Sequence, residues 1–255
     1  MQNHILIRPL SSFKPLLSLF FITLVFPTWI QAAEDDFLQW HSSNLQLLRG
    51  YDYELGSEKR TIMTFEHASA WTFGDLYVFS DYSWPDGGDT SYYVEPTLRF
   101  SLSKITGKDF SYGIIKDVLI SGQIEKPEGQ SARKLLGFAV DLDLAGFKYF
   151  KTNFFVRDNP NLSGDTYQTT LAWSRAFQVN GIKILLEGFA DLVGSEGVTV
   201  SHQLIVPRFL IDVGQITGMK ENKFWLGFEW QYWHNKFGVD GVTESVPQFQ
   251  MKYVF

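Results

Sequence analysis

Apolar and polar residues alternate along many short stretches of the chain. Between residues 92 and 103 every second residue is apolar, and most of the residues between them are polar or charged. Successive side chains of a strand point to opposite faces, so this period of two predicts a strand with one apolar and one wet face. The same alternation recurs over 136–144, 224–233 and 248–255. The polar face is too charged for a buried core, and it predicts a water-filled lumen.

Marking strands in this way gives about twelve along the chain. They cover residues 40–51, 60–71, 73–82, 91–103, 112–122, 133–144, 147–158, 166–177, 182–192, 200–212, 222–233 and 244–255. Their lengths suit a tilted crossing of a lipid bilayer. We therefore predict an all-β fold, a transmembrane antiparallel β-barrel. Residues expected to face lipid include Val94, Leu98, Phe100, Phe138, Val140, Leu142 and Met251.

The connections between these strands are expected to alternate in length. Longer, polar connections fall at 52–59, 83–90, 123–132, 159–165, 193–199 and 234–243. The intervening ones are mostly tight, although those near 104–111 and 213–221 are longer. An even strand number puts the first set on the side away from both chain ends, as in outer-membrane barrels with long external loops. Aromatic residues near strand ends, such as Trp71, Tyr82 and Tyr253, are expected to form interfacial rings.

The first residues have the pattern of an export signal. Two basic residues, Arg8 and Lys14, precede a largely apolar run and then a small-residue cleavage site at Ala32. This order predicts a secretory signal peptide at 1–32 and a barrel at 33–255. An N-terminal membrane anchor is less favoured, because the apolar run is short and contains two prolines.

The composition narrows the class further. Aromatic residues make up 16% of the chain, yet the mean hydropathy is only −0.08. Alternating lumenal and lipid-facing residues produce such an average. A soluble β-sandwich can have the same mean hydropathy, but its loops are not expected to alternate between long and short along the chain. The net charge of −6 and the lack of a basic stripe argue against nucleic acid as a partner.

Sequence motifs for catalysis or metal binding are missing. The chain has no cysteine, no Gly-x-Ser-x-Gly, no His-Glu-x-x-His and no phosphate loop. His67 and His202 occur singly within predicted strands. We therefore expect no enzyme, no metal site and no cofactor.

Three blocks of sequence resemble the Tsx-like nucleoside-specific channel-forming outer-membrane proteins. Residues 95–111 (EPTLRFSLSKITGKDFS) resemble the family in general, and 113–121 and 230–241 are similar to its OmpK branch. The chain also ends on Phe255 with Tyr253 two residues before it, like the assembly signal of outer-membrane barrels.

This resemblance implies a monomeric twelve-stranded barrel in the Gram-negative outer membrane, with a narrow pore that passes nucleosides. It also implies contact with outer-membrane lipid and recognition of Phe255 by the barrel-assembly machinery. Members of the OmpK branch serve as phage receptors, so phage is a further expected partner. The alternative function is a phage-receptor or structural barrel with little or no selective transport.

Candidate solute-binding residues follow from the polar faces of the predicted strands. A nucleoside pore should offer aromatic faces, each base stack contributing about 1–3 kcal/mol, together with polar groups for hydroxyls and base edges. Binding must also be weak and repeated. The lumenal candidates are Tyr77, Phe79, Asp81, Tyr93, Glu95, Arg99, Asp141, Asn153, Phe155, Arg157, Glu187, Phe189, Gln231 and Trp233.

Two interpretations of this polar face stay open. In the first, the base stacks on Phe79, Phe155, Phe189 and Trp233 while Asp81, Glu95, Arg99, Arg157 and Glu187 bind hydroxyls and ring edges. In the second, the aromatic rings only fill a narrow barrel and the charges pair across it, as in small barrels plugged by their own side chains.

Overall fold

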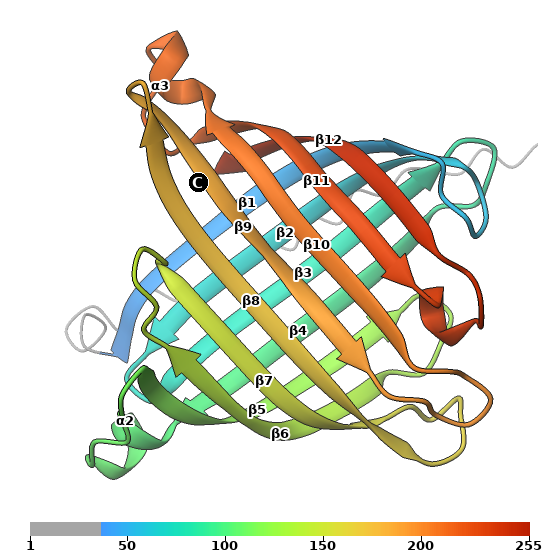
Figure 1. The fold of residues 1–255 in the computed structure, drawn as a ribbon, viewed down its shortest axis with the longest axis horizontal. Coiled ribbons are helices and arrows are strands. Elements are labelled where there is room, and N and C mark those ends of the chain that lie inside the picture. Colours follow the sequence, from blue (N-terminus) through green and yellow to red (C-terminus); the bar gives the residue numbers. More distant parts are fainter. Residues whose placement is uncertain (1–36) are drawn as a thin grey trace, which may run out of the picture. The chain divides into compact units, whose positions relative to one another are not determined.

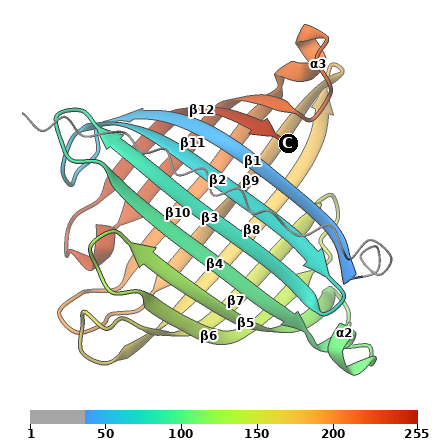
Figure 2. The ribbon, with the colours of Figure 1, turned by 180° about the vertical axis from the view of Figure 1, so that it is seen from behind.

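The protein is a closed antiparallel barrel in the computed structural model, which describes residues 37–255 (Figures 1 and 2). The predicted signal peptide, residues 1–32, lies outside the described residues. Each strand pairs with its neighbour in sequence, and β1 pairs with β12 to close the ring. None of the helices within 37–255 is long and apolar enough to cross a membrane.

The strands confirm the predicted fold class. They are β1 (Leu38–Tyr51), β2 (Lys59–Trp71), β3 (Gly74–Pro85), β4 (Ser91–Ser101), β5 (Ile115–Pro127), β6 (Arg133–Leu142), β7 (Tyr149–Asp158), β8 (Asp165–Val179), β9 (Ile182–Val193), β10 (His202–Asp212), β11 (Phe224–His234) and β12 (Glu244–Val254). Three short helical segments, α2 (Leu102–Thr106), α3 (Val213–Thr217) and η1 (Lys236–Gly238), lie between strands.

The borders of β5 differ most from the prediction. It runs from Ile115 to Pro127, whereas the alternation predicts 112–122. Residues 112–115 instead form a tight turn, closed by hydrogen bonds between Tyr112 and Ile115 and passing through Gly113 at φ +59°. The sequence from Ile114 to Ile120 is apolar on both faces, so alternation could not mark where this strand begins.

The outer face of the barrel is apolar. Leu98, Phe100 and Phe138 point outward and are 37%, 39% and 52% exposed, which confirms the predicted lipid-facing pattern. Aromatic rings gather near both ends of the strands, as in the contacts Phe73–Phe100 (centroids 5.5 Å apart) and Tyr82–Trp84 (4.4 Å). Exposed apolar residues between two aromatic rings are what a membrane-spanning barrel presents to lipid.

The interior is polar. Buried side chains with almost no exposed surface include Gln46, Gln248, Gln250 and Glu244, whereas the buried hydrophobic cluster holds only Leu48, Tyr53, Ile62 and Val246. A soluble protein has the opposite distribution. The inside of the barrel is therefore a hydrogen-bonded polar core, and that core positions every candidate site residue.

The two ends of the barrel differ in their connections. We call the end at which β1 begins and β12 stops the terminus end, and the other the distal end. Distal loops span 52–58, 86–90, 128–132, 159–164, 194–201 and 235–243; the terminus end has the connections 72–73, 102–114, 143–148, 180–181 and 213–223.

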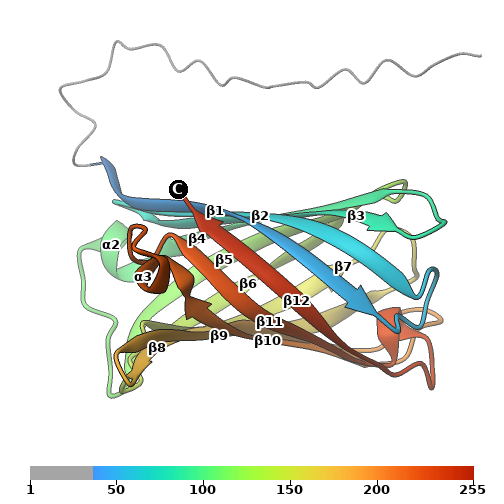
Figure 3. The same cartoon turned by 90° about the horizontal axis from the view of Figure 1, so that it is seen from above.

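The two terminus-end connections that the sequence marks as longer exceptions, near 104–111 and 213–221, are long in the structure too. Connections 102–114 and 213–223 are longer than any distal loop, and each starts with a short helix, α2 or α3 (Figure 3). Helix α2 begins where the Ser101 side chain accepts a hydrogen bond from the Lys104 amide (3.1 Å), and it ends at Gly107 in the left-handed region (φ 69°). A capped helical turn can follow a strand at either end of a barrel, so loop parity alone does not predict loop length.

Candidate functional site

All fourteen candidate residues lie on the lumenal face. They come from β3 (Tyr77, Phe79, Asp81), β4 (Tyr93, Glu95, Arg99), β6 (Asp141), β7 (Asn153, Phe155, Arg157), β9 (Glu187, Phe189) and β11 (Gln231, Trp233). The period of two places them there, because each strand has its outward neighbours in the apolar belt. Their contacts, however, divide them into groups with different chemistry.

A central ion network crosses the middle of the lumen. We use this name for Glu66, Glu187, Arg208, Glu229 and Lys252. The Arg208 guanidinium donates to Glu66 and to Glu229, at 2.6 Å each, and Lys252 donates to Glu187. Strands β2 and β10 are not neighbours in the closed order, so the Arg208–Glu66 contact bridges the interior. Glu187 is thus bound to protein cations.

A second group of charges holds the terminus end together. Arg99 on β4 donates to Asp75 on β3 (2.8 Å) and to Asp141 on β6 (2.7 Å). Lys151 on β7 also donates to Asp75, at 3.1 Å, although β3 and β7 are separated by three strands. Two of the candidates, Arg99 and Asp141, therefore pair with each other.

The distal mouth is narrowed by side chains from its loops. Glu196, from loop 194–201, accepts from Arg157 (2.7 Å) and from the Asn159 amide (3.0 Å), and its side chain is 1% exposed. Arg157 also donates to Glu125, at 3.2 Å. The candidate Arg157 thus holds a loop inside the mouth.

On the other side of the mouth, Lys236 of η1 donates to Glu244, which also accepts from the candidate Gln231 (2.7 Å). Burial lowers the pKa of the Lys236 ammonium group, while the nearby Glu244 carboxylate opposes that shift. Burial likewise raises the pKa of Tyr53, whose hydroxyl donates to Gln248 at 2.6 Å. Both loop residues are therefore packed into the barrel.

The lumenal aromatic residues are spread along the barrel. Phe79 makes an edge-on contact with Tyr93 (centroids 6.2 Å apart), and Trp233 lies against His202 (6.0 Å) and Phe237 (5.0 Å). Phe155 is buried, at 3% exposure. No ring contact in the described part of the chain joins any two of Phe79, Phe155, Phe189 and Trp233. A continuous aromatic ladder is thus not formed by direct contact.

Three lumenal carboxylates have no cation beside them. We call Asp81, Glu95 and Asp191 the acid set. Each accepts a hydrogen bond from a hydroxyl, of Thr64, Tyr93 or Thr170 respectively. None of the ion pairs found within residues 37–255 includes any of the three. Their oxygens retain acceptor capacity for a solute.

Several of these residues are missing from the sequence-based candidates. Asp75 and Asp191 stand on the polar faces of predicted strands, as do four members of the central ion network, Glu66, Arg208, Glu229 and Lys252. Glu125 lies in the predicted loop 123–132, which the structure shows to be the end of β5. A signal existed for Arg208, which interrupts an apolar run between Pro207 and Phe209. A cation inside a strand that is otherwise apolar indicates a buried partner on another strand.

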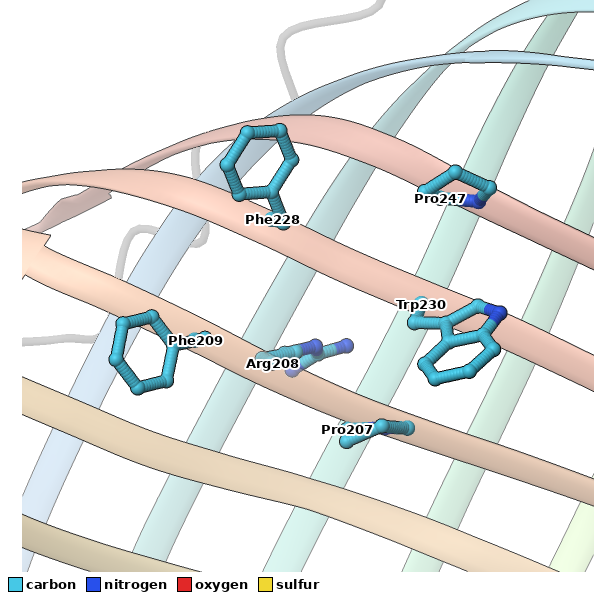
Figure 4. Close-up of a pocket in the computed structure, with 6 residues that line it drawn as sticks. All are labelled: Pro207, Arg208, Phe209, Phe228, Trp230 and Pro247. Carbon is cyan, nitrogen blue, oxygen red and sulfur yellow. The ribbon is translucent and has the colours of Figure 1, made fainter.

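One hollow lies outside the lumen. It is formed by Pro207, Phe209, Phe228, Trp230 and Pro247 on the outer face of β10–β12, while the side chain of Arg208 leaves it toward the interior (Figure 4). Trp230 pairs with Pro247, and the β10–β11 ladder is interrupted beside Pro207, which has no N–H to donate. This apolar hollow faces lipid and takes no part in a lumenal pathway.

These features define the protein as an outer-membrane β-barrel: a closed ladder, an apolar outer belt and a charged, hydrogen-bonded lumen. Solved structures with a similar fold include the KdgM porin, with 6% identity and a TM-score of 0.47 over 83% of this chain and 99% of that one. The Acinetobacter baumannii outer membrane protein Omp33 shows 11% identity and a TM-score of 0.40 over 86% of this chain and 100% of that one.

A BenF-like porin from Pseudomonas fluorescens Pf-5 is a more distant match, with 9% identity and a TM-score of 0.23 over 86% of this chain and 99% of that one. At these scores the class assignment rests on the strand pairing and burial of the protein itself. No model of a protein family matches the chain, and no curated protein matches it. The resemblance to Tsx-like channels therefore stays a prediction.

Proposed function

We propose that the protein is an outer-membrane channel through which small polar solutes diffuse, and that nucleosides are its preferred class. The observation that carries this proposal is the association of lumenal rings with unpaired carboxylates on β3 and β4. Phe79 is the register partner of Glu95, and Asp81 is the register partner of Tyr93. The Tyr93 hydroxyl donates to Glu95 at 2.6 Å, and its ring contacts Phe79.

This group has the two kinds of contact that a nucleoside needs. The faces of Phe79 and Tyr93 can stack a base, and the free oxygens of Asp81 and Glu95 can accept from ribose hydroxyls or base N–H groups. Arg99, Arg157 and Glu187 are instead occupied by other protein charges. We assign these three to holding the lumen in shape, so the solute-binding group is smaller than the sequence predicts.

The test is block of single-channel current in planar bilayers. Added nucleoside should reduce the current of the wild type, and equal glucose should not. Phe79→Ala should weaken that block by about fivefold or more, since one base stack contributes about 1–3 kcal/mol. The control is Phe138→Ala, because Phe138 faces lipid. Equal block in Phe79→Ala and wild type would contradict nucleoside binding at this group.

A second candidate function is a surface receptor, phage included, on a closed barrel. It is favoured by Glu196 and Lys236, which are buried in the distal mouth. Reconstituted protein that conducts no current in any variant would support this function over a channel.

Assembly is expected to use the end of β12. Phe255 is 63% exposed and packs edge-on against Tyr253, at 5.6 Å. We infer that this exposed aromatic end is available to the barrel-assembly machinery before the β1–β12 pair closes.

A further inference from the structure

The acid set places three carboxyl groups on lumenal faces of strands from both sides of the barrel. Asp81 lies on β3 and Glu95 on β4, whereas Asp191 lies on β9, which is five strands from β4 in the closed order. The charges of Asp191, Asp81 and also Glu125 act on Glu95. Carboxylates from opposite walls of the barrel therefore face a shared space.

Protein cations do not neutralise this space. Arg157 and Arg208 are the lumenal guanidinium groups that act electrostatically on Asp191 and Asp81, but neither forms an ion pair with them. Arg157 is instead hydrogen-bonded to Glu125 and Glu196, and Arg208 to Glu66 and Glu229. In a narrow lumen of low effective dielectric, uncompensated carboxylates attract cations more strongly than they would in water.

Gln168 gives independent evidence for a missing partner. This side chain, on β8, is 2% exposed, and its Oε1 atom has no hydrogen-bond partner within residues 37–255. The Thr170 hydroxyl donates to Asp191, so its oxygen is left to accept from the Gln168 Nε2 atom (3.3 Å). That arrangement fixes which end of the amide is free: the Nε2 atom faces Thr170, the donor to Asp191, and the Oε1 atom is the buried end without a donor.

A buried acceptor with nothing to accept from destabilises the folded protein unless a ligand supplies the donor. The free groups here are all acceptors, namely three carboxylates and one amide oxygen. A neutral donor satisfies the acceptors, whereas a cation satisfies the acceptors and also neutralises the ionised carboxylates. That cation is not a tightly held metal ion, since no group of three His, Asp or Glu side chains in the described part of the chain has the arrangement to hold one.

We propose that Asp81, Glu95, Asp191 and Gln168 form a binding step for monovalent cations, which makes the lumen cation-selective. The ligand is an inorganic cation or the ammonium group of a small solute, held weakly enough to leave again. This inference rests on the proposed channel function, because only an open lumen brings cations to the acid set. It adds a charge preference that a path for neutral nucleosides does not require.

The experiment measures the reversal potential of the reconstituted full barrel in a KCl gradient, and then in a methylammonium chloride gradient. Wild type should prefer K⁺ to Cl⁻. Asp191→Asn and Glu95→Gln should each lower that preference by about threefold or more, since each removes one of three interacting charges. The matched control is Asp109→Asn, because Asp109 is an exposed acid in the turn 102–114.

Gln168→Glu is expected to increase cation selectivity, which is a change that a damaged fold would not produce. A fourth carboxylate should raise the preference for cations above that of wild type, and Gln168→Leu should lower it. A preference for methylammonium over K⁺ would identify an ammonium solute as the ligand, and the reverse would identify the inorganic ion.

The outcomes separate the two proposals. Current with nucleoside block but no cation preference, or the same preference in Asp191→Asn, Glu95→Gln and Gln168→Glu as in wild type, would overturn this inference alone. Absence of current in correctly folded protein would overturn the channel function and the inference with it. Folding of each variant is checked by the different migration of unheated and boiled protein on a gel.

Discussion

At the scale of single residues, Arg208 is the buried cation on which several carboxylates of the central ion network depend. It is 5% exposed and joins carboxylates of β2 and β11. Its removal leaves Glu229 buried without a cation, and it leaves Glu66 with only the longer contact to Lys252, at 3.9 Å. Losing one partner of a buried ion pair costs about 3–5 kcal/mol, far more than losing the whole pair. The charge of Arg208 is therefore expected to matter for stability.

We expect Arg208→Met to lower the free energy of unfolding by about 3–5 kcal/mol. Adding Glu66→Gln and Glu229→Gln to it should recover much of that loss, because the orphaned charges are then removed. The measurement is urea unfolding in detergent micelles. Arg49→Ala, which breaks the exposed pair with Asp86, is the control and should leave the unfolding midpoint unchanged. A single Arg208→Met variant as stable as wild type would show that the network is not needed.

Sequence alternation predicts the face of a residue but not its partner. It places Glu95 and Arg99 on one wet face, about 13 Å apart along the strand. Arg99 then bonds to Asp75 and Asp141, whereas Glu95 bonds only to Tyr93. Which charges are neutralised depends on strands that meet across the lumen, such as β9 and β12 for Glu187 and Lys252. Which strands meet across the lumen depends on the curvature and stagger of the closed barrel. The sequence could therefore predict which face of each strand carries the site residues, but not which of those residues contact each other.

At the scale of elements, loop 194–201 extends into the distal mouth and is bound there. Glu196 is the only carboxylate in this loop, and it is buried. It accepts hydrogen bonds from Arg157 and from the Asn159 amide. Breaking these bonds should free the loop while leaving the strand ladder intact, because Glu196 lies outside β9 and β10.

Glu196→Ala should therefore raise the single-channel conductance, and it should leave the block by nucleoside in place. Planar-bilayer recordings test this, with Glu128→Gln in the distal loop 128–132, which joins β5 to β6, as the control. Conductance that is equal in Glu196→Ala and wild type would indicate that the mouth is not the narrowest part of the path.

Strand positions could be predicted because each crossing repeats the same alternation between lipid and lumen. The prediction was wrong where that contrast disappears, at the start of β5, and at the end of β4, where helix α2 takes residues 102–103 of the predicted strand. Helical turns of five residues carry too little periodicity to be seen beside strands.

At the scale of the whole molecule, the barrel requires that neighbouring residues of one strand experience opposite solvents. On β8, Leu171 faces outward and Ala172 faces the lumen beside Phe189. Leu171→Arg should cost about 2–4 kcal/mol of stability near the membrane midplane. Ala172→Arg should cost less, because its charge can enter the polar interior. Urea unfolding in lipid bilayers measures both, and the reverse order would contradict the assigned faces.

The pairing of β1 with β12 has a consequence for how the chain encodes the barrel. Asn44 lies opposite Val254, and the Phe255 amide donates to Ser43 at 2.9 Å, so the first and last strands are joined by the same kind of antiparallel ladder as the consecutive pairs. The strand ladder is a closed ring, so the native chain termini mark only one of several connections at which the polypeptide could begin and end. A circular permutant that begins in loop 86–90, with a short linker between β12 and β1, would contain every pair of strands present in the native order.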